Sequence, residues 1–126
     1  VHLSAGYWQK YGKPDPQIVA QAEAKGVVFL TCPHALMGST DAALATLGCF
    51  PPSHVMANTY YTFSQGAKVA VECMLMAADA NLLAMDEEVI SIAGSSSGAD
   101  TALVLTPAFP NDCFNLRVRE IIAKPR

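Results

Sequence analysis

The start of the chain has the pattern of a strand, a helix and a second strand, and this order constrains the fold more than any other feature. Residues 1–3 have a strand pattern, and the apolar run Val27–Leu30 predicts a strand covered on both faces. Between them, Asp15-Pro16 suits a helix start and Gly26 a helix end, which predicts a helix over residues 16–25. Two strands joined by one helix run parallel with a right-handed crossover, so we expect an α/β domain.

The middle of the chain is expected to be helical. A short helix is predicted over Thr40–Leu47 and a longer one over about Val55–Ala80. On a helical wheel the longer segment is mostly apolar and has one narrow polar stripe, formed by Tyr61, Gln65, Lys68, Glu72 and Asp79. We therefore expect this helix to be covered on several sides.

The last part of the chain is expected to form strands. Val89–Ala93 and Thr101–Thr106 are apolar strand patterns on either side of the Ser/Gly loop Gly94–Asp100. Leu116–Ala123 alternates in a way that suits an edge strand.

Composition excludes several classes of protein. The 126 residues suit one domain, and 52% are hydrophobic while only 15% are charged, which favours a compact chain. Eight Lys and Arg against eleven Asp and Glu give a net charge of −3 without a basic block, so nucleic acid is not an expected partner. The longest apolar stretch, Val69–Ala78, is interrupted by Glu72 and is too short to span a membrane.

The four cysteines, Cys32, Cys49, Cys73 and Cys113, form no C-x-x-C pair. We expect a reduced, cytoplasmic chain. Cys32 and His34 could supply two metal ligands, but a buried thiol beside a loop histidine is the commoner arrangement, and no metal is assigned.

Three segments together resemble a known family. They are Glu72–Asp79, Ile92–Ala102 and Arg119–Arg126, and they are similar to the stand-alone pyruvate kinase C-terminal-domain-like proteins of archaea and bacteria. The resemblance implies a three-layer α/β/α sandwich on a mostly parallel sheet of about five strands whose last strand is antiparallel. It also implies that residues 1–126 are a single domain that lacks an N-terminal strand and helix.

The same resemblance implies a ligand. In pyruvate kinase this domain carries an allosteric sugar-phosphate site, partly on a loop similar to Gly94–Thr101, while the catalytic barrel is not in this chain. Stand-alone relatives look like flavin mononucleotide (FMN) binders. We therefore expect a binding domain for FMN or a phosphorylated metabolite, without pyruvate kinase activity of its own.

The residue types of that loop fit phosphate binding. Glycines let backbone amides converge on an anion, and serine and threonine hydroxyls add donors without charge. The candidate residues are Gly94, Ser95, Ser96, Ser97, Gly98, Asp100 and Thr101. A flexible polar turn is the alternative. Asp100 would repel a phosphate, so it is expected to cap the turn or to bond a ligand hydroxyl.

Aromatic residues near the start could hold a flavin ring. Tyr7, Trp8 and Tyr11 lie in a loop expected after the first strand, where they would either stack on a ligand or simply cover the end of the sheet.

Other polar residues give rise to further functional hypotheses. Glu72 and Asp79 could form a carboxylate pair, but a surface ion pair between Lys68 and Glu72 is the simpler explanation. His34 and His54 could act as bases in loops, and Ser39-Thr40-Asp41 could bind an anion or merely cap a helix. These residues leave two alternatives to the binding domain: an enzyme acting on a phosphorylated metabolite, or a ligand-free module that forms a homo-oligomer.

Overall fold

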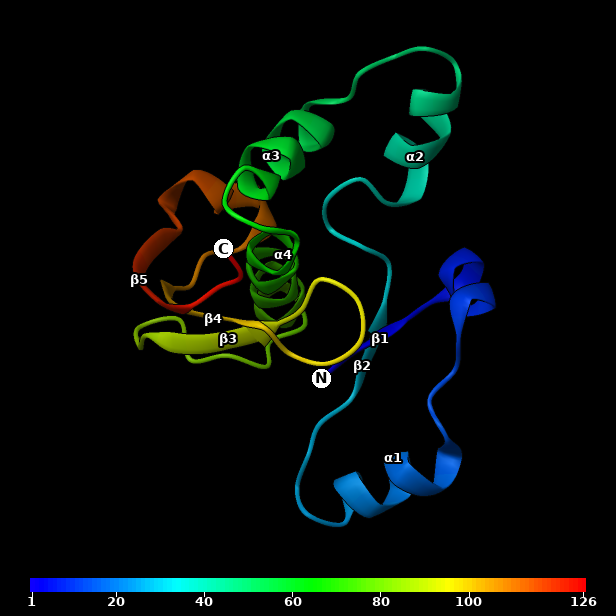
Figure 1. Ribbon diagram of the computed structural model, residues 1–126, viewed down its shortest axis with the longest axis vertical. Coiled ribbons are helices and arrows are strands. Elements are labelled where there is room, and N and C mark those ends of the chain that lie inside the picture. The colour runs from blue at the N-terminus through cyan, green and yellow to red at the C-terminus, as the bar shows by residue number, and fades with distance from the viewer. The chain divides into compact units, whose positions relative to one another are not determined.

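The computed structural model describes residues 1–126 and divides into two compact units, Val1–Pro33 and His34–Arg126. Figure 1 labels the elements in chain order. The expectation that residues 1–126 form a single domain stays a prediction.

The first unit contains a small parallel sheet. Strands β1 (His2–Ser4) and β2 (Leu30–Cys32) pair in parallel, with Leu3 opposite Thr31. Between them lie a 3₁₀ helix, η1 (Gly6–Tyr11), and helix α1 (Pro16–Glu23).

The predicted strand-helix-strand order and its parallel pairing are confirmed. The predicted cap is confirmed as well, because the Asp15 carboxylate accepts the amide of Gln17. The run Val27–Leu30 is not covered on both faces, since Val28 is exposed and the strand begins only at Leu30.

Three helices open the second unit: α2 (Ser39–Thr46), α3 (Pro52–Tyr61) and α4 (Gln65–Asp79). The single long helix predicted over residues 55–80 is wrong, because the chain breaks after Tyr61 and starts again at Ser64. The Ser64 hydroxyl accepts the amide of Ala67 and so caps α4. The prediction therefore treated Ser64, which caps α4, as an interior residue of one continuous helix.

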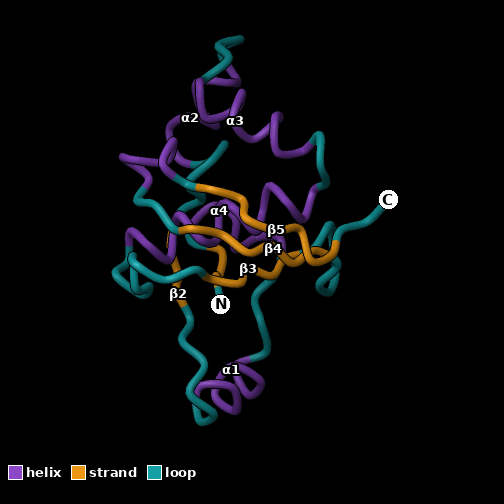
Figure 2. The backbone as a smooth tube through the Cα atoms, turned by 90° about the vertical axis from the view of Figure 1, so that its left-hand side faces the viewer, coloured by secondary structure: helices purple, strands orange, loops and turns teal.

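The second unit also contains an antiparallel sheet with the strand order β3-β4-β5 (Figure 2). The strands are β3 (Val89–Ala93), β4 (Thr101–Thr106) and β5 (Arg117–Ala123), with the 3₁₀ helix η2 (Pro110–Asn115) before the last. The positions of all three strands and the edge position of β5 agree with the sequence patterns.

The predicted three-layer sandwich with a mostly parallel sheet of about five strands is wrong. Strands β1 and β2 pair only with each other, and the other three strands form a separate antiparallel sheet. The physical reason lies in the connection Gly94–Asp100, which has no helix to carry the chain back for a parallel strand and therefore closes a hairpin.

The core of the second unit lies between α4 and one face of this sheet (Figure 1). Val71, Met74 and Leu75 of α4 are buried together with Leu103 and Leu105 of β4. On the opposite face Ile90 and Ile92 of β3 are 64% and 61% exposed. The apolar residues of α4 are thus covered by other parts of the second unit, as expected for a helix covered on several sides. No helix has both the length and the apolar character needed to cross a membrane.

Candidate functional site

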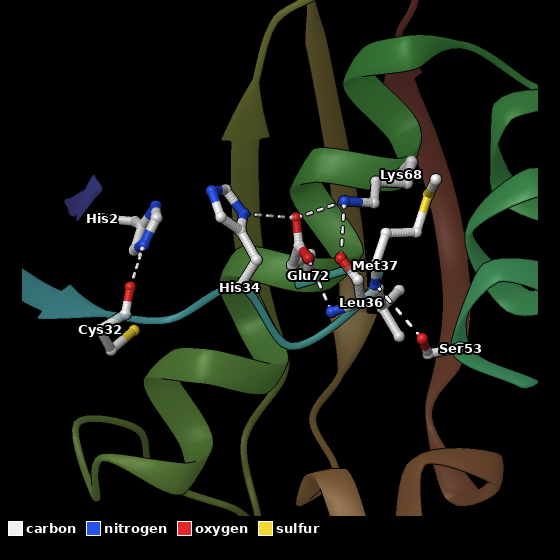
Figure 3. A network of polar contacts seen from close by, with 8 residues as sticks. All are labelled: His2, Cys32, His34, Leu36, Met37, Ser53, Lys68 and Glu72. Carbon is white, nitrogen blue, oxygen red and sulfur yellow. Dashed lines mark hydrogen bonds and ion pairs between the residues drawn. The ribbon is translucent and has the colours of Figure 1, made fainter. Parts of the chain in front are cut away.

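A buried carboxylate organises a polar network at the middle of α4 (Figure 3). Glu72 is 1% exposed and accepts three donors: the Lys68 ammonium at 2.6 Å, the Leu36 amide at 2.7 Å and His34 Nδ1 at 3.2 Å. Lys68, one turn earlier on the helix, is itself buried, and its Nζ also donates to the Leu36 carbonyl at 3.4 Å. The predicted i,i+4 ion pair exists, but the prediction of an exposed stripe is wrong at these two positions.

The donors around Glu72 keep it ionised. Burial by itself raises the pKa of this carboxyl group. Hydrogen bonds from His34 and Lys68, the charge of Lys68 and the Leu36 amide together outweigh burial, so that the pKa lies below its ordinary value of 4.5. A buried ion pair is thus held by enough partners to stay charged.

The segment that covers this network has an unusual backbone. Met37 and Ser39 have φ angles of 61° and 52°, in the left-handed region that side chains other than glycine rarely adopt. The Met37 amide donates to the Ser53 hydroxyl at 3.4 Å, and that hydroxyl donates to Asp41. Strained residues of this kind persist only where surrounding contacts hold them, and they are concentrated at functional sites.

The predicted phosphate loop is the connection Gly94–Asp100 of the β3-β4 hairpin, and its three serines are exposed. The Asp100 amide donates to the Ala93 carbonyl at 3.0 Å and closes the turn. A side chain at Gly94 would collide with the Gly98 carbonyl, so the backbone at Gly98 lies directly against Gly94. The loop residues named from the sequence therefore lie together at one end of the β3-β4 hairpin.

The Asp100 carboxylate accepts hydrogen bonds from two donors of this loop. Its carboxylate accepts the Ser95 amide at 2.9 Å and the Thr101 hydroxyl at 2.6 Å. These hydrogen bonds, with that from Thr101 contributing most, lower the pKa of Asp100. The expectation that Asp100 caps the turn is confirmed.

The loop also meets the start of α4. A Cβ atom at Gly66 would lie 2.7 Å from Asp100 Oδ1, and the Ser64 and Thr101 hydroxyls are 3.4 Å apart. The first turn of a helix exposes unpaired amides and carries a partial positive charge. The Asp100 carboxylate thus lies near a helix end that favours an anion.

The aromatic residues form a cluster in η1. The Tyr7 and Trp8 rings meet edge to face with centroids 5.6 Å apart, and Trp8 and Tyr11 lie 5.3 Å apart. Lys10 Nζ lies 3.6 Å from the centroid of the Tyr7 ring, and its hydrogen bond and charge lower the pKa of Tyr7. Tyr7 and Tyr11 are each 69% exposed. The predicted loop is thus a helical turn with two exposed aromatic rings.

Several other candidate residues do not join a site. His54, expected in a loop, is buried in α3, where it meets Phe50 edge to face and its Nε2 has no hydrogen-bond partner. Asp79 is exposed at the last residue of α4, whereas Glu72 is buried. No group of three or more His, Cys, Asp or Glu side chains is placed to hold a metal ion.

Sequence reasoning missed several residues that take part in these arrangements. The Leu36 amide and the Ser53 hydroxyl had no distinctive signal, because a backbone donor and a serine after two prolines occur in many loops. Ser64 had one: a serine three residues before Ala67, at the start of an apolar helical run, is an ordinary capping pattern.

No known protein-family model matches the chain. The resemblance to pyruvate kinase C-terminal-domain-like proteins therefore stays a prediction, and its expected layered fold is overturned by the strand pairing described above.

Proposed function

We propose that this protein binds a small molecule through its phosphate group, and that the loop Gly94–Thr101 holds that group. FMN and phosphorylated metabolites are the candidate ligands. The proposal includes no pyruvate kinase activity.

One observation carries this proposal: two donors of the loop already converge on an oxyanion. The Ser95 amide and the Thr101 hydroxyl both donate to the carboxylate of Asp100, next to the first turn of α4. A phosphate oxygen has the same acceptor chemistry as a carboxylate oxygen. The exposed hydroxyls of Ser95, Ser96 and Ser97 add further donors around the same turn.

The Asp100 carboxylate also affects how a phosphate can bind to this loop. It is ionised, so it repels an incoming phosphate and competes for the same donors. A ligand phosphate must displace this side chain. Weakening the competitor should therefore tighten binding, which gives the proposal a distinctive signature.

FMN and riboflavin provide a matched pair of probes, because they differ only in the phosphate group. We expect saturable quenching of FMN fluorescence by the full chain and weaker quenching of riboflavin. Asp100→Asn should strengthen FMN binding, and Ser96→Asp, which adds a negative charge at an exposed position, should weaken it. Neither substitution should change riboflavin binding.

Inorganic phosphate extends the test to ligands other than FMN. Added phosphate should shift the NMR signals of the Ser95 and Thr101 amides, with a stronger effect in Asp100→Asn. If neither FMN nor phosphate perturbs the loop in the wild type or in this variant, the proposal is wrong.

Self-association is a second candidate function, favoured by the exposed sheet face. Ile90 and Ile92 point away from α4, and a sheet face with large exposed apolar side chains is a common interface. Sedimentation at micromolar concentration should show a dimer that Ile92→Lys converts to a monomer. A wild-type monomer under these conditions would exclude this function.

A further inference from the structure

Helix α2 presents a mostly apolar face to solvent. Four residues with the spacing i, i+3, i+4 and i+7 share one side of this helix: Thr40, Ala43, Leu44 and Leu47. All four are exposed, and the exposed fractions of Leu44 and Leu47 are 43% and 77%. A surface helix usually turns its apolar side toward the core. Helix α2 does the reverse.

Hydrogen bonds define both ends of α2. At its start, the Ser53 hydroxyl donates to the Asp41 carboxylate. At its end, Gly48 has a φ of 79°, and the Cys49 amide donates to the Leu44 carbonyl at 3.3 Å. A left-handed glycine followed by such a bond is the Schellman cap that ends many helices. The exposed face therefore belongs to a defined helix and not to an irregular loop.

The second unit does not supply packing for this face. Figure 1 shows α2 set apart from α4 and from the β3-β4-β5 sheet, and no other helix or strand packs along it. Isolated helices shorter than about 12–15 residues are marginally stable in water. Helix α2 has eight residues, and none of them is buried. A partner that covered its apolar face would supply the missing packing.

The sequence around this face carries almost no charge. From Gly26 to Ala67 the only Asp, Glu, Lys or Arg residue is Asp41. The loop after α2 continues the apolar surface, since Phe50 is 67% exposed. We call the side chains of Ala43, Leu44, Leu47 and Phe50 the α2 patch. Cores of protein interfaces are poor in charge and rich in aromatic residues, whereas helices that lie on membranes carry Lys and Arg beside their apolar face. The α2 patch therefore suits a protein partner.

The absence of charge favours a second copy of this chain as that partner. A two-fold contact places a surface patch against its own copy, so a charged residue near the axis would face a charge of the same sign. The α2 patch contains no charged residue. The small side chain of Ala43 lets two helices approach, and the neighbouring leucines can then fill the space between them. The patch is thus complementary to itself.

We propose that two copies of this chain associate through their α2 patches across a two-fold axis. The patch has four residues, fewer than the roughly 20–30 residues a side of a standard interface, so the contact is weak and forms at high protein concentration. It uses a different surface from the sheet face with Ile90 and Ile92. It depends neither on association through that face nor on phosphate binding at the Gly94–Thr101 loop.

Sedimentation of the full-length Ile92→Lys variant separates this contact from the sheet face. We expect a monomer at about 10 μM and an average mass well above that of the monomer at about 1 mM. Adding Leu47→Lys brings two like charges together at the axis and should raise the dissociation constant at least about tenfold. A monomer at every concentration, or an unchanged dissociation constant in the double variant, would overturn the proposal.

Phe114→Lys in the same Ile92→Lys background is the matched control. It also replaces an exposed apolar side chain by lysine, but in η2 and not in the α2 patch. The dissociation constant should stay the same. A rise equal to that caused by Leu47→Lys would show that added charge anywhere on the surface weakens association, which would contradict a specific contact at α2.

NMR of the wild-type chain locates the contact without a substitution. Dilution from millimolar to micromolar concentration should shift the amide signals of Ala43, Leu44 and Leu47. In a mixture of labelled and unlabelled chains, filtered NOEs should connect the methyl groups of these leucines to a second chain. Vesicles of phosphatidylcholine should leave the same signals unchanged. Signals of α2 that respond to vesicles but not to dilution would mean that a lipid surface covers the patch, and the proposal would be wrong.

Discussion

Glu72 and Asp100 are two hydrogen-bonded carboxylates in opposite surroundings. Each accepts one backbone amide and at least one side chain, and hydrogen bonds lower the pKa of each. Glu72 is buried and faces the ammonium group of Lys68. Asp100 is exposed and is bonded to neutral donors.

Burial makes the partners of Glu72 harder to replace than those of Asp100. Water can replace the partners of Asp100 when they are lost, whereas nothing replaces those of Glu72. Glu72 therefore ties helix α4 to the segment that begins at His34, while the hydrogen bonds to the Asp100 carboxylate come only from Ser95 and Thr101. The exposed carboxylate is correspondingly easier to exchange for a ligand.

The largest effect is expected for a substitution of Glu72, the buried carboxylate. Glu72→Gln leaves the ammonium group of Lys68 buried without its counter-charge, and it should lower the free energy of unfolding by about 3–5 kcal/mol in urea denaturation. Glu88→Gln is the matched control, because its ion pair with Arg119 is more than half exposed and should contribute less than about 1 kcal/mol. Equal losses in the two variants would contradict the comparison.

The acid dependence of stability should also reflect Glu72. Its pKa in the folded protein lies below the ordinary value of 4.5, so its stabilising contribution is present above that value and is lost as the pH falls through the lower folded pKa. We expect the free energy of unfolding to decrease below about pH 5, and this decrease to be shallower in Glu72→Gln. The curve for Asp100→Asn should stay close to that of the wild type. If the decrease in the free energy of unfolding at acid pH became shallower only in Asp100→Asn, then Asp100 and not Glu72 would dominate the acid dependence.

A smaller effect is expected where the Asp100 turn meets helix α4. Gly66→Ala should lower the free energy of unfolding by about 1–3 kcal/mol, because the new Cβ would lie 2.7 Å from Asp100 Oδ1 and Thr101 Cβ. In an exposed helix the same change would stabilise by about 1 kcal/mol. Gly98→Ala is the control: it has open space but a φ of 80°, and should cost about 1 kcal/mol from backbone strain alone. A stabilised Gly66→Ala protein would mean that the loop does not pack on α4.

The smallest effect is expected for Asp100→Asn. The amide oxygen of asparagine can still accept one of the two donors, and water can satisfy the other. The thermal midpoint should therefore change little, while the Ser95 amide signal in NMR spectra should move. A large loss of stability would show that this exposed carboxylate supports more than its own turn.

Short stretches of sequence predicted those elements that depend on neighbouring residues. The Asp15 cap with Pro16 predicted α1, apolar strand patterns on either side of the Ser/Gly loop predicted β3 and β4, and alternation predicted the edge strand β5. The loop Gly94–Thr101 was recognised as one cluster for the same reason, since its residues are neighbours in the chain. The Ser64 cap was overlooked, and with it the break between α3 and α4.

Contacts between distant segments could not be predicted in this way. A helical wheel places Lys68 and Glu72 on a polar stripe, and polarity alone suggests that the stripe faces water. The structure instead covers both residues with the segment that contains His34 and Leu36, more than thirty residues earlier in the chain. The Leu36 amide that holds Glu72 carries no sequence signal at all.

The amino-acid sequence by itself determined where most helices and strands lie, because caps, turn residues and apolar periodicity act over a few neighbouring positions. Only the tertiary structure decided which strands pair and which carboxylate is buried. Both outcomes depend on free energies summed over segments far apart in the chain: hydrogen bonds between whole strands in one case, and desolvation balanced by several donors in the other.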